Sequence, residues 1–303
     1  MFKNRREFLL QTGAAGLFTL VGGSVQSGPI SASSIFSQSR KQNGNLNFPI
    51  TSIVQTWTNE DSTYLVVMSP KNRGLSYVVQ VDGTQTSLPV MIVQSETRKF
   101  SDYQIDKIRV NNLRLGLKYR LLVLDNQSGK VVDERFFKAF DRNAKNFRFA
   151  LISCMNDFYK DACVSAWPPV LQQKPDVVFM IGDTVYSDND TDSRKDHKGG
   201  EANYWKRYCD TRSRLSYFYA KDLIPTLASW DDHDFGANNG NKNFKEKTTN
   251  RYLFDLFWQG SSGVGSKSGY TYFGKGDLEG YDKSFGVSFS FQTRLMDFYL
   301  MDD

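Results

Sequence analysis

Between about residue 48 and residue 140, the chain alternates short runs of β-branched and aromatic residues with polar turn sequences. Such runs are typical of strands, and a glycine after Asp or Ser is typical of the turns between them. We predict strands in these runs: Ser52–Trp57, Thr63–Met68, Ser76–Val81, Tyr119–Leu124 and Val131–Phe137. Residues 48–140 are therefore predicted to form a small all-β sandwich.

After about residue 146 the pattern changes to longer apolar runs that each end in small or acidic residues. These runs cover residues 147–154, 176–183 and 227–234, and a helical pattern extends from Tyr204 to Leu223 between the last two. Strands that alternate with helices form a sheet whose ligand site lies at the carboxyl ends of the strands. We therefore predict an α/β domain from residue 147 to residue 303, with its site where the three runs end.

Composition and charge narrow the class of protein. The chain has 303 residues, 14% of them aromatic, which suits a folded protein with large cores. Of the net charge of +5, the first seven residues carry +2, which leaves +3 for the rest and indicates no nucleic-acid partner. Three cysteines are too few for a disulfide scaffold. Cys163 and Cys209 could form a disulfide after export or remain two unrelated buried thiols.

The first 34 residues have the features of a signal peptide. Arg5 and Arg6 precede Phe8 and Leu9, and a glycine-containing apolar stretch and a patch of small residues follow. This order predicts a twin-arginine signal at 1–34 and the twin-arginine export machinery as a partner, with an ordinary secretory leader as the alternative. A polar linker follows at 35–47. We expect a periplasmic, extracellular or cell-surface protein with no membrane span after cleavage of the leader.

Acidic residues and a histidine gather at the predicted strand ends. Asp183 follows an apolar strand and a glycine, and the block Asp231–Asp234 holds three carboxylates and an imidazole. Such a concentration of negative charge is costly unless a cation or a hydrogen-bond network holds it, so we predict a metal site. The alternatives are a turn residue at Asp183 that caps the next segment and, for the acidic block, an acidic surface loop with a helix cap. Cys154 is either a buried small residue or a ligand.

Five successive motifs resemble those of PhoD-like alkaline phosphatases: Ser153-Cys154, Gly182 to Tyr186, Trp230 to Asn238, Asp255 to Trp258, and Leu295 to Asp303. The resemblance covers roughly residues 147 to 303. It implies an α/β metallophosphoesterase-like sandwich preceded by a small all-β domain similar to fibronectin type III. The stretch from Leu113 to Tyr119 also resembles the leucine-to-tyrosine turn of fibronectin type III modules.

The same resemblance implies a metal-binding role for several residues. Cys154 and Tyr186 would be ligands of a ferric ion, and Asp183 would bridge it to a second metal, calcium in this family. Asn238 would offer an amide oxygen to the second metal, with Asn239 as the substitute. The implied cofactors are thus Fe³⁺ and Ca²⁺.

The resemblance also implies roles for the residues of the acidic block. His233 would stabilise the transferring phosphoryl group or the leaving oxygen. Asp232 would orient His233 or complete the metal shell, whereas Asp234 would support the loop and Asp231 has no clear assignment.

One part of the family pattern is missing. Members of the family carry a late Ser-Gly-Asp-x-His type motif that supplies further metal ligands, whereas this chain has only two histidines, His197 and His233. His197 lies in a polar loop and does not replace that motif. We therefore expect an incomplete metallophosphoesterase domain from a truncated chain, whose open sheet edge and incomplete metal shell can reduce its activity or stability.

Another acidic segment, Asp188 to Asp192, alternates acidic residues as a calcium loop does. Ser193 and Gly199 occupy the positions where an EF-hand needs a glycine and a glutamate, so we interpret the segment as a mobile acidic loop.

The sequence is compatible with two different functions. The first is an exported metal-dependent phosphoesterase of the alkaline phosphatase or phosphodiesterase type, acting on phosphate esters through metal-activated hydroxide. The alternative is a non-catalytic cell-surface or glycan-binding protein with a degenerate phosphatase-like domain.

Overall fold

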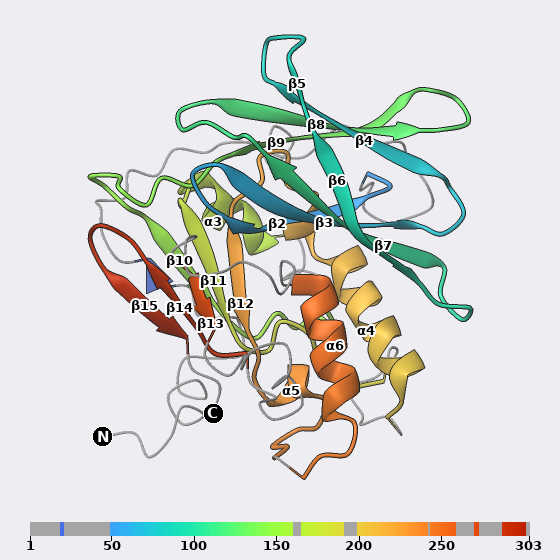
Figure 1. Ribbon diagram of the computed structural model, residues 1–303. Coiled ribbons are helices and arrows are strands. Elements are labelled where there is room, and N and C mark those ends of the chain that lie inside the picture. Colours follow the sequence, from blue (N-terminus) through green and yellow to red (C-terminus); the bar gives the residue numbers. More distant parts are fainter. Residues whose placement is uncertain are drawn as a thin grey trace.

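The structure is a computed structural model that describes residues 49–159, 165–190, 199–241, 243–258 and 287–300, and the backbone of residues 19–20 and 270–272. The predicted leader, apart from residues 19–20, lies outside the described residues, and so do the whole predicted linker, Cys163 and His197. Two antiparallel sheets lie at the top of the molecule in Figure 1, above a region of mixed strands and helices.

The two upper sheets contain every strand predicted between residues 48 and 140. One sheet has the order β2 (Ser52–Thr58), β3 (Ser62–Pro70), β7 (Tyr103–Asn111) and β6 (Val90–Thr97). The other has the order β5 (Ser87–Leu88), β4 (Leu75–Val81), β8 (Lys118–Asp125) and β9 (Val131–Lys138). Strands β5, β6 and β7 were not predicted, because polar residues in them interrupt the apolar alternation that is typical of a strand.

The two sheets share one hydrophobic core. Leu65 and Ile108 of the first sheet and Val79 and Leu121 of the second are fully buried in the same cluster. The backbone N–H of Arg114 donates to the Tyr119 hydroxyl at 2.6 Å, which closes the turn before β8. The likeness of this unit to fibronectin type III remains a prediction.

A parallel sheet forms the centre of the lower region, and the mixed α/β fold is confirmed. Its order is β1 (Thr19–Leu20), β10 (Phe149–Ile152), β11 (Val177–Ile181) and β12 (Thr226–Ser229), with β1 antiparallel to β10. The helices are α3 (Trp167–Gln172), α4 (Glu201–Arg214), α5 (Asp232–Phe235) and α6 (Lys247–Trp258), and η2 (Ser216–Tyr219) is a 3₁₀ turn.

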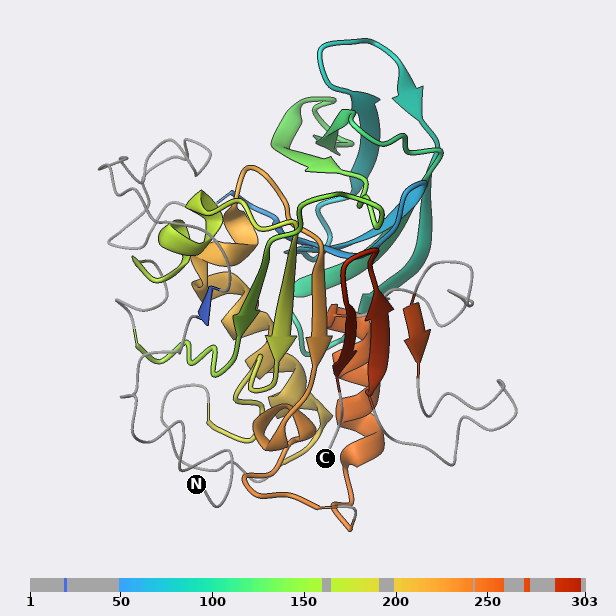
Figure 2. The same cartoon turned by 90° about the vertical axis from the view of Figure 1, so that its left-hand side faces the viewer.

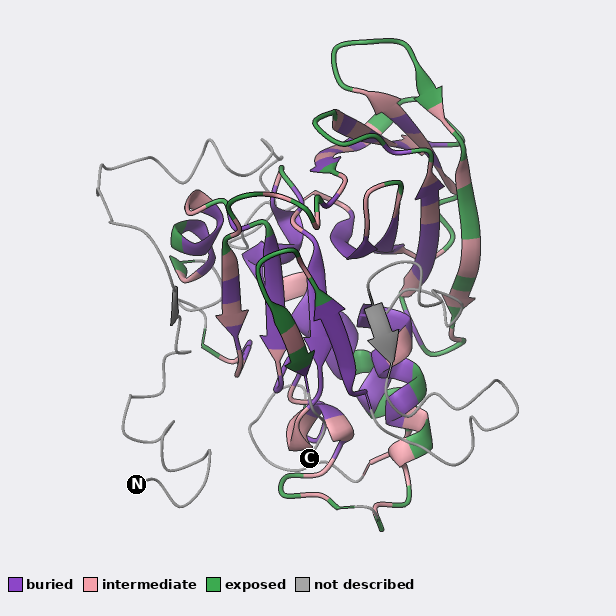
Figure 3. Cartoon of the chain, turned by 60° about the vertical axis from the view of Figure 1, so that its left-hand side comes forward, coloured by how far each residue is buried: buried purple, intermediate pink, exposed green. Residues whose placement is uncertain are grey.

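Both faces of the parallel sheet are covered, and its central strands are buried (Figure 3), which explains the continuous apolar run of β11. Val178 and Met180 face the cluster that contains α4 and α6 residues, whereas Phe179 faces the antiparallel sheet of β13 (Tyr270–Tyr272), β14 (Phe289–Gln292) and β15 (Asp297–Leu300). The rings of Phe179 and Phe298 lie 4.6 Å apart between those two sheets. Figure 2 shows β14 and β15 beside the parallel strands. A metallophosphoesterase-like sandwich remains a prediction for this region.

Helix α4 ends at Arg214, before the predicted end at Leu223. Leu215 has extended backbone angles, φ −82° and ψ 122°, and η2 follows with all four residues buried. A continued α-helix would distribute the aromatic residues Tyr217, Phe218 and Tyr219 around its axis, whereas the tighter turn buries all of them.

Arg212 joins the upper and lower regions. Its guanidinium is fully buried and donates to the carbonyl oxygens of Ser52 and Val66 in the first sheet and of Phe257 in α6, at 3.0 to 3.3 Å. Burial lowers the pKa of Arg212 to about 9. These contacts hold α4 against the upper sheets.

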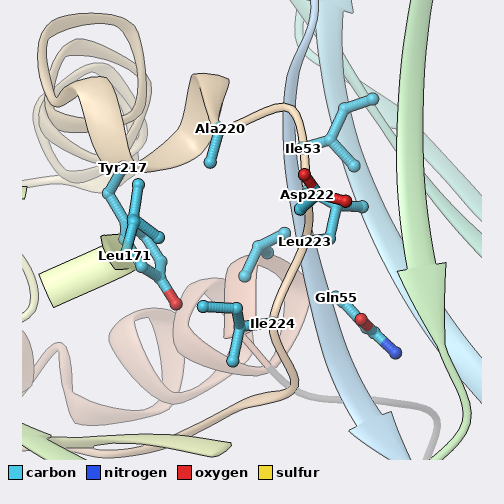
Figure 4. Close-up of a pocket in the computed structure, with 9 residues that line it drawn as sticks. Ile53, Gln55, Leu171, Tyr217, Ala220, Asp222, Leu223 and Ile224 are labelled. Carbon is cyan, nitrogen blue, oxygen red and sulfur yellow. The ribbon is translucent and has the colours of Figure 1, made fainter. Parts of the chain in front are cut away.

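A small cavity lies at the same junction (Figure 4). Its lining includes Ile53 of β2, Leu171 of α3, and Leu223 and Ile224 just before β12. It therefore lies near the amino end of β12, at the edge of the sheet opposite the strand ends that carry the acidic residues. Its size, room for about one water molecule, excludes a substrate site.

Among the described residues, no helix combines the length and the apolar character that crossing a membrane requires.

Candidate metal centre

The carboxyl ends of β10, β11 and β12 bring Cys154, Asp183 and the acidic block to one edge of the parallel sheet. Backbone hydrogen bonds lock the first two segments together. The N–H of Cys154 donates to the Gly182 carbonyl at 3.2 Å, and the N–H of Met155 donates to the Asp183 carbonyl at 2.8 Å. The predicted convergence of the three strand ends is confirmed.

The backbone at this edge is strained. Cys154 and Asp183 have φ of 57° and 52°, in the left-handed region that non-glycine residues rarely adopt. Gly182, with φ 112°, leaves no room for a side chain, because a Cβ there would lie 2.6 Å from the Asp231 Cβ. Strain of this kind costs about 1–3 kcal/mol per residue and is concentrated at functional sites.

Asp183 lies at the centre of the first group of side chains. Its Oδ2 is 3.5 Å from both the Cys154 Sγ and the Tyr186 hydroxyl, which both point toward it as donors. Its Oδ1 is buried and has no hydrogen-bond partner among the described residues. A buried carboxylate oxygen without a partner is costly in a folded protein, so this atom fits a bound cation.

The pKa values describe the same group in chemical terms. Burial raises the pKa of Asp183 to about 6, with the His233 charge opposing this and Asp231 and Asp232 adding to it. Burial and the Asp183 charge raise the pKa of the Cys154 thiol to about 11 and that of the Tyr186 hydroxyl well above its usual value. Three such groups become anionic together only when a cation lies among them.

A second group contains Asp183 again, with Asp232 and His233. Each of the three offers a ligand atom, and these atoms all lie within 4.8 Å of one another. Carboxylate oxygens and an imidazole nitrogen at this separation suit a divalent or trivalent ion. The donors that the structure brings together therefore fit metal, and Asp183 is common to both groups.

The orientation of His233 is fixed by Asp188. The His233 Nδ1 lies 2.8 Å and 2.9 Å from the two carboxylate oxygens of Asp188, which leaves Nε2 available to the site. The Tyr186 ring lies 4.2 Å from the imidazole, and the Ser187 hydroxyl donates to the His233 carbonyl at 2.7 Å. Burial lowers the pKa of His233, but the Asp188 hydrogen bond and nearby carboxylates outweigh it, so the pKa rises to about 9.

Sequence reasoning missed Asp188. Its interpretation as part of a mobile acidic loop is wrong, because the residue is 4% exposed and bonded to His233. The signal that could have found it is its position five residues after Asp183, directly behind Tyr186 and Ser187. Residues 191–198, which include the end of that segment, lie outside the described residues.

Two members of the acidic block form a helix cap. The Asp231 side chain caps α5 by accepting the N–H of Asp232, and the Asp234 side chain accepts the N–H of Asp231 at 3.1 Å. Asp234 is fully buried and also accepts the N–H groups of Thr184 and Val185 at 3.1 Å and 2.9 Å. Burial raises the pKa of Asp234 to about 8. The predicted helix cap is therefore present at Asp231 and Asp234, whereas the predicted acidic surface loop is wrong for Asp234, which is buried.

Asp232 contacts the turn that carries Asn238 and Asn239. Asp232 accepts the N–H of His233 at 2.9 Å and that of Asn239 at 2.6 Å. Asn238 and Asn239 are both exposed. The structure thus brings together Cys154, Asp183, Tyr186, Asp232 and His233, with the asparagines on the adjoining turn.

Comparisons with known proteins agree with the resemblance. The sequence model of the PhoD-like phosphatase family matches residues 149–255. Alkaline phosphatase D of Bacillus subtilis (strain 168) is 27% identical over 110 residues, which is 33% of this chain and 18% of that protein. The match thus spans less than a fifth of the relative's length. No solved structure matches the chain.

The family match extends from β10 into α6 and includes every residue of the candidate centre. The resemblance to PhoD-like phosphatases is therefore confirmed for the motifs within residues 149–255, whereas the motif from Leu295 to Asp303 lies beyond the match.

Proposed function

From the PhoD-like phosphatase match at residues 149–255, we propose that the protein is an exported metal-dependent phosphoesterase of the alkaline phosphatase or phosphodiesterase type. The observation that carries this proposal is Asp183, a buried carboxylate shared by two groups of donors, with one oxygen that lacks a partner among the described residues. A substrate with a phosphate ester complements a centre of bound cations at an acidic sheet edge.

Asp183 would bridge two metals, with Cys154 and Tyr186 on one side and Asp232 on the other. Thiolate and phenolate suit ferric iron, and carboxylate with the Asn238 amide oxygen suits calcium, in keeping with the family pattern. When bound, such metals polarise the phosphoryl group and lower the pKa of an attacking water.

His233 would act on the leaving group. Because Asp188 holds Nδ1, the Nε2 atom is the one that can donate a hydrogen bond or a proton toward the oxygen that departs from phosphorus. A carboxylate behind an imidazole fixes both the tautomer and the ring orientation. Asp188 would therefore be a positioning residue for His233.

Hydrolysis of a chromogenic phosphate monoester and diester, before and after metal removal with a chelator, tests the proposed function. The expected result is hydrolysis that the chelator removes and added metal restores. Hydrolysis that survives complete metal removal would contradict metal dependence.

Ferric ligation by Tyr186 predicts a coloured protein, because a phenolate bound to Fe³⁺ absorbs visible light by charge transfer. Replacement Tyr186→Phe removes the oxygen but keeps the ring against His233, so the visible band should shift or vanish while the protein stays folded. Visible absorption and circular dichroism of the two proteins measure this. A colourless wild-type protein that is active and iron-free would rule out this role.

The twin-arginine leader is a further part of the proposal. Replacement of Arg5 and Arg6 by lysine should block export and leave folded protein in the cytoplasm, because the export receptor reads the arginine pair. Cell fractionation of wild type and variant checks this, and undiminished export would indicate an ordinary secretory leader.

A further inference from the structure

A buried ion pair lies behind the candidate metal centre. Arg207 of α4 and Asp157 both have side chains with 0% exposure. The guanidinium binds the carboxylate through two nitrogens, with Nη2 2.5 Å from Oδ1 and Nη1 3.3 Å from Oδ2. The Phe158 ring covers the guanidinium at 4.5 Å. None of these three residues belongs to the metal-binding groups described above.

The two residues of this ion pair are connected to two different proposed metal ligands, Cys154 and Tyr186. Asp157 comes three residues after Cys154 on the same strand-end segment. The Arg207 Nε donates to the carbonyl oxygen of Tyr186 at 3.1 Å. One rigid guanidinium therefore joins the segment that carries the thiol to the segment that carries the phenol.

The energetics favour a geometric role for this pair. Removing two charges from water offsets most of their attraction, so a buried ion pair adds little stability compared with apolar residues of the same size. A planar arginine fork, in contrast, fixes direction as well as distance, and lysine cannot reproduce it.

We propose that Arg207 is a positioning residue that sets the Cys154 thiol against the Tyr186 hydroxyl, so that both face Asp183 before metal arrives. This proposal rests on the proposed function for its purpose, but its geometric claim concerns the metal-free chain. Arg207 touches neither the thiol nor the phenol and acts through Asp157 and the Tyr186 backbone.

The competing explanation is that Arg207 only neutralises Asp157. Arg214 provides the control, because its Nη1 lies 3.0 Å from the Asp157 Oδ2. Its side chain is 36% exposed and also pairs with Asp210. Arg207→Lys and Arg214→Lys both preserve the positive charge, but only the first removes the fork that reaches Tyr186.

The experiment measures alkylation of Cys154 by iodoacetamide in the metal-free full chain, read by mass spectrometry of the Cys154 peptide. Loss of the fork should loosen the segment and raise the Cys154 labelling rate about tenfold in Arg207→Lys. In Arg214→Lys the rate should stay within about twofold, as for a substitution at a partly exposed site. Ferric citrate titration of the same proteins should show affinity about 10–100-fold weaker for Arg207→Lys alone.

Asp157→Asn provides a second variant in case Arg207→Lys does not fold. It removes the charge and one of the two acceptor oxygens that hold the Cys154 segment, and it keeps the Arg207 hydrogen bond to Tyr186, so labelling of Cys154 should rise as well. Equal labelling in Arg207→Lys and Arg214→Lys would overturn the proposal, and so would unchanged labelling in a folded Asp157→Asn. Altered labelling in a chain that hydrolyses no phosphate ester would support the positioning role and reject the proposed function.

Discussion

Asp183→Asn should lose bound metal and reduce phosphate-ester hydrolysis by more than about 100-fold, the upper range for partners that only support metal ligands. The amide keeps the side-chain volume but removes the charge that would bind and separate two cations. Atomic absorption and turnover measured on the same preparation check both effects.

Asp231→Asn is the matched control. Asp231 lies at the same sheet edge, but its side chain caps α5, and asparagine caps a helix about as well as aspartate. This variant should keep its metal and most of its activity.

Metal-free Asp183→Asn should also unfold at no lower a temperature than the metal-free wild type, because burial raises the pKa of Asp183 and so disfavours its charged form. Full metal occupancy with normal turnover in Asp183→Asn would remove the bridging role.

His233→Asn should behave differently from Asp183→Asn. We expect it to retain metal and to lower kcat by about 10²-fold or more, because an imidazole that donates to the leaving oxygen contributes that much. Metal content and kcat separate the two roles, and metal loss in His233→Asn would identify the histidine as a ligand.

Asp188→Asn provides the companion measurement to His233→Asn. Since Asp188 acts through His233, the double variant should be little slower than His233→Asn alone. Fully multiplicative losses in the double variant would mean that Asp188 has an independent role.

The strand positions were largely predictable, because apolar periodicity and strand-end polar residues reflect burial directly. Strand β11 was clear since both of its faces are covered. Strands β6 and β7 were not, because in β7 the buried polar residues Asp106 and Lys107 interrupt the apolar pattern. Their compensating partners, such as the Tyr77 hydroxyl on Asp106 at 2.5 Å, come from distant parts of the chain.

The candidate centre was predictable only in part for a similar reason. Asp183 and His233 lie at strand ends that any reader of the sequence would inspect. Asp188 and Arg207 do not lie directly at a strand end. Their roles depend on burial and on contacts with residues that are distant in the sequence, His233 for Asp188 (45 residues away) and Tyr186 for Arg207 (21 residues away). Within the acidic block, local spacing could not separate the capping residue Asp231 from Asp232, because only the three-dimensional turn decides which carboxylate faces the cap.

The metal content of the purified protein is the most direct test of the central claim that Asp183 organises a metal centre for phosphate-ester hydrolysis. We expect the wild-type protein to bind iron together with a second metal, calcium, and Asp183→Asn to bind less of both. A wild-type protein that purifies without metal, takes none up from solution and binds a glycan would contradict the proposed metal centre and favour a non-catalytic surface protein.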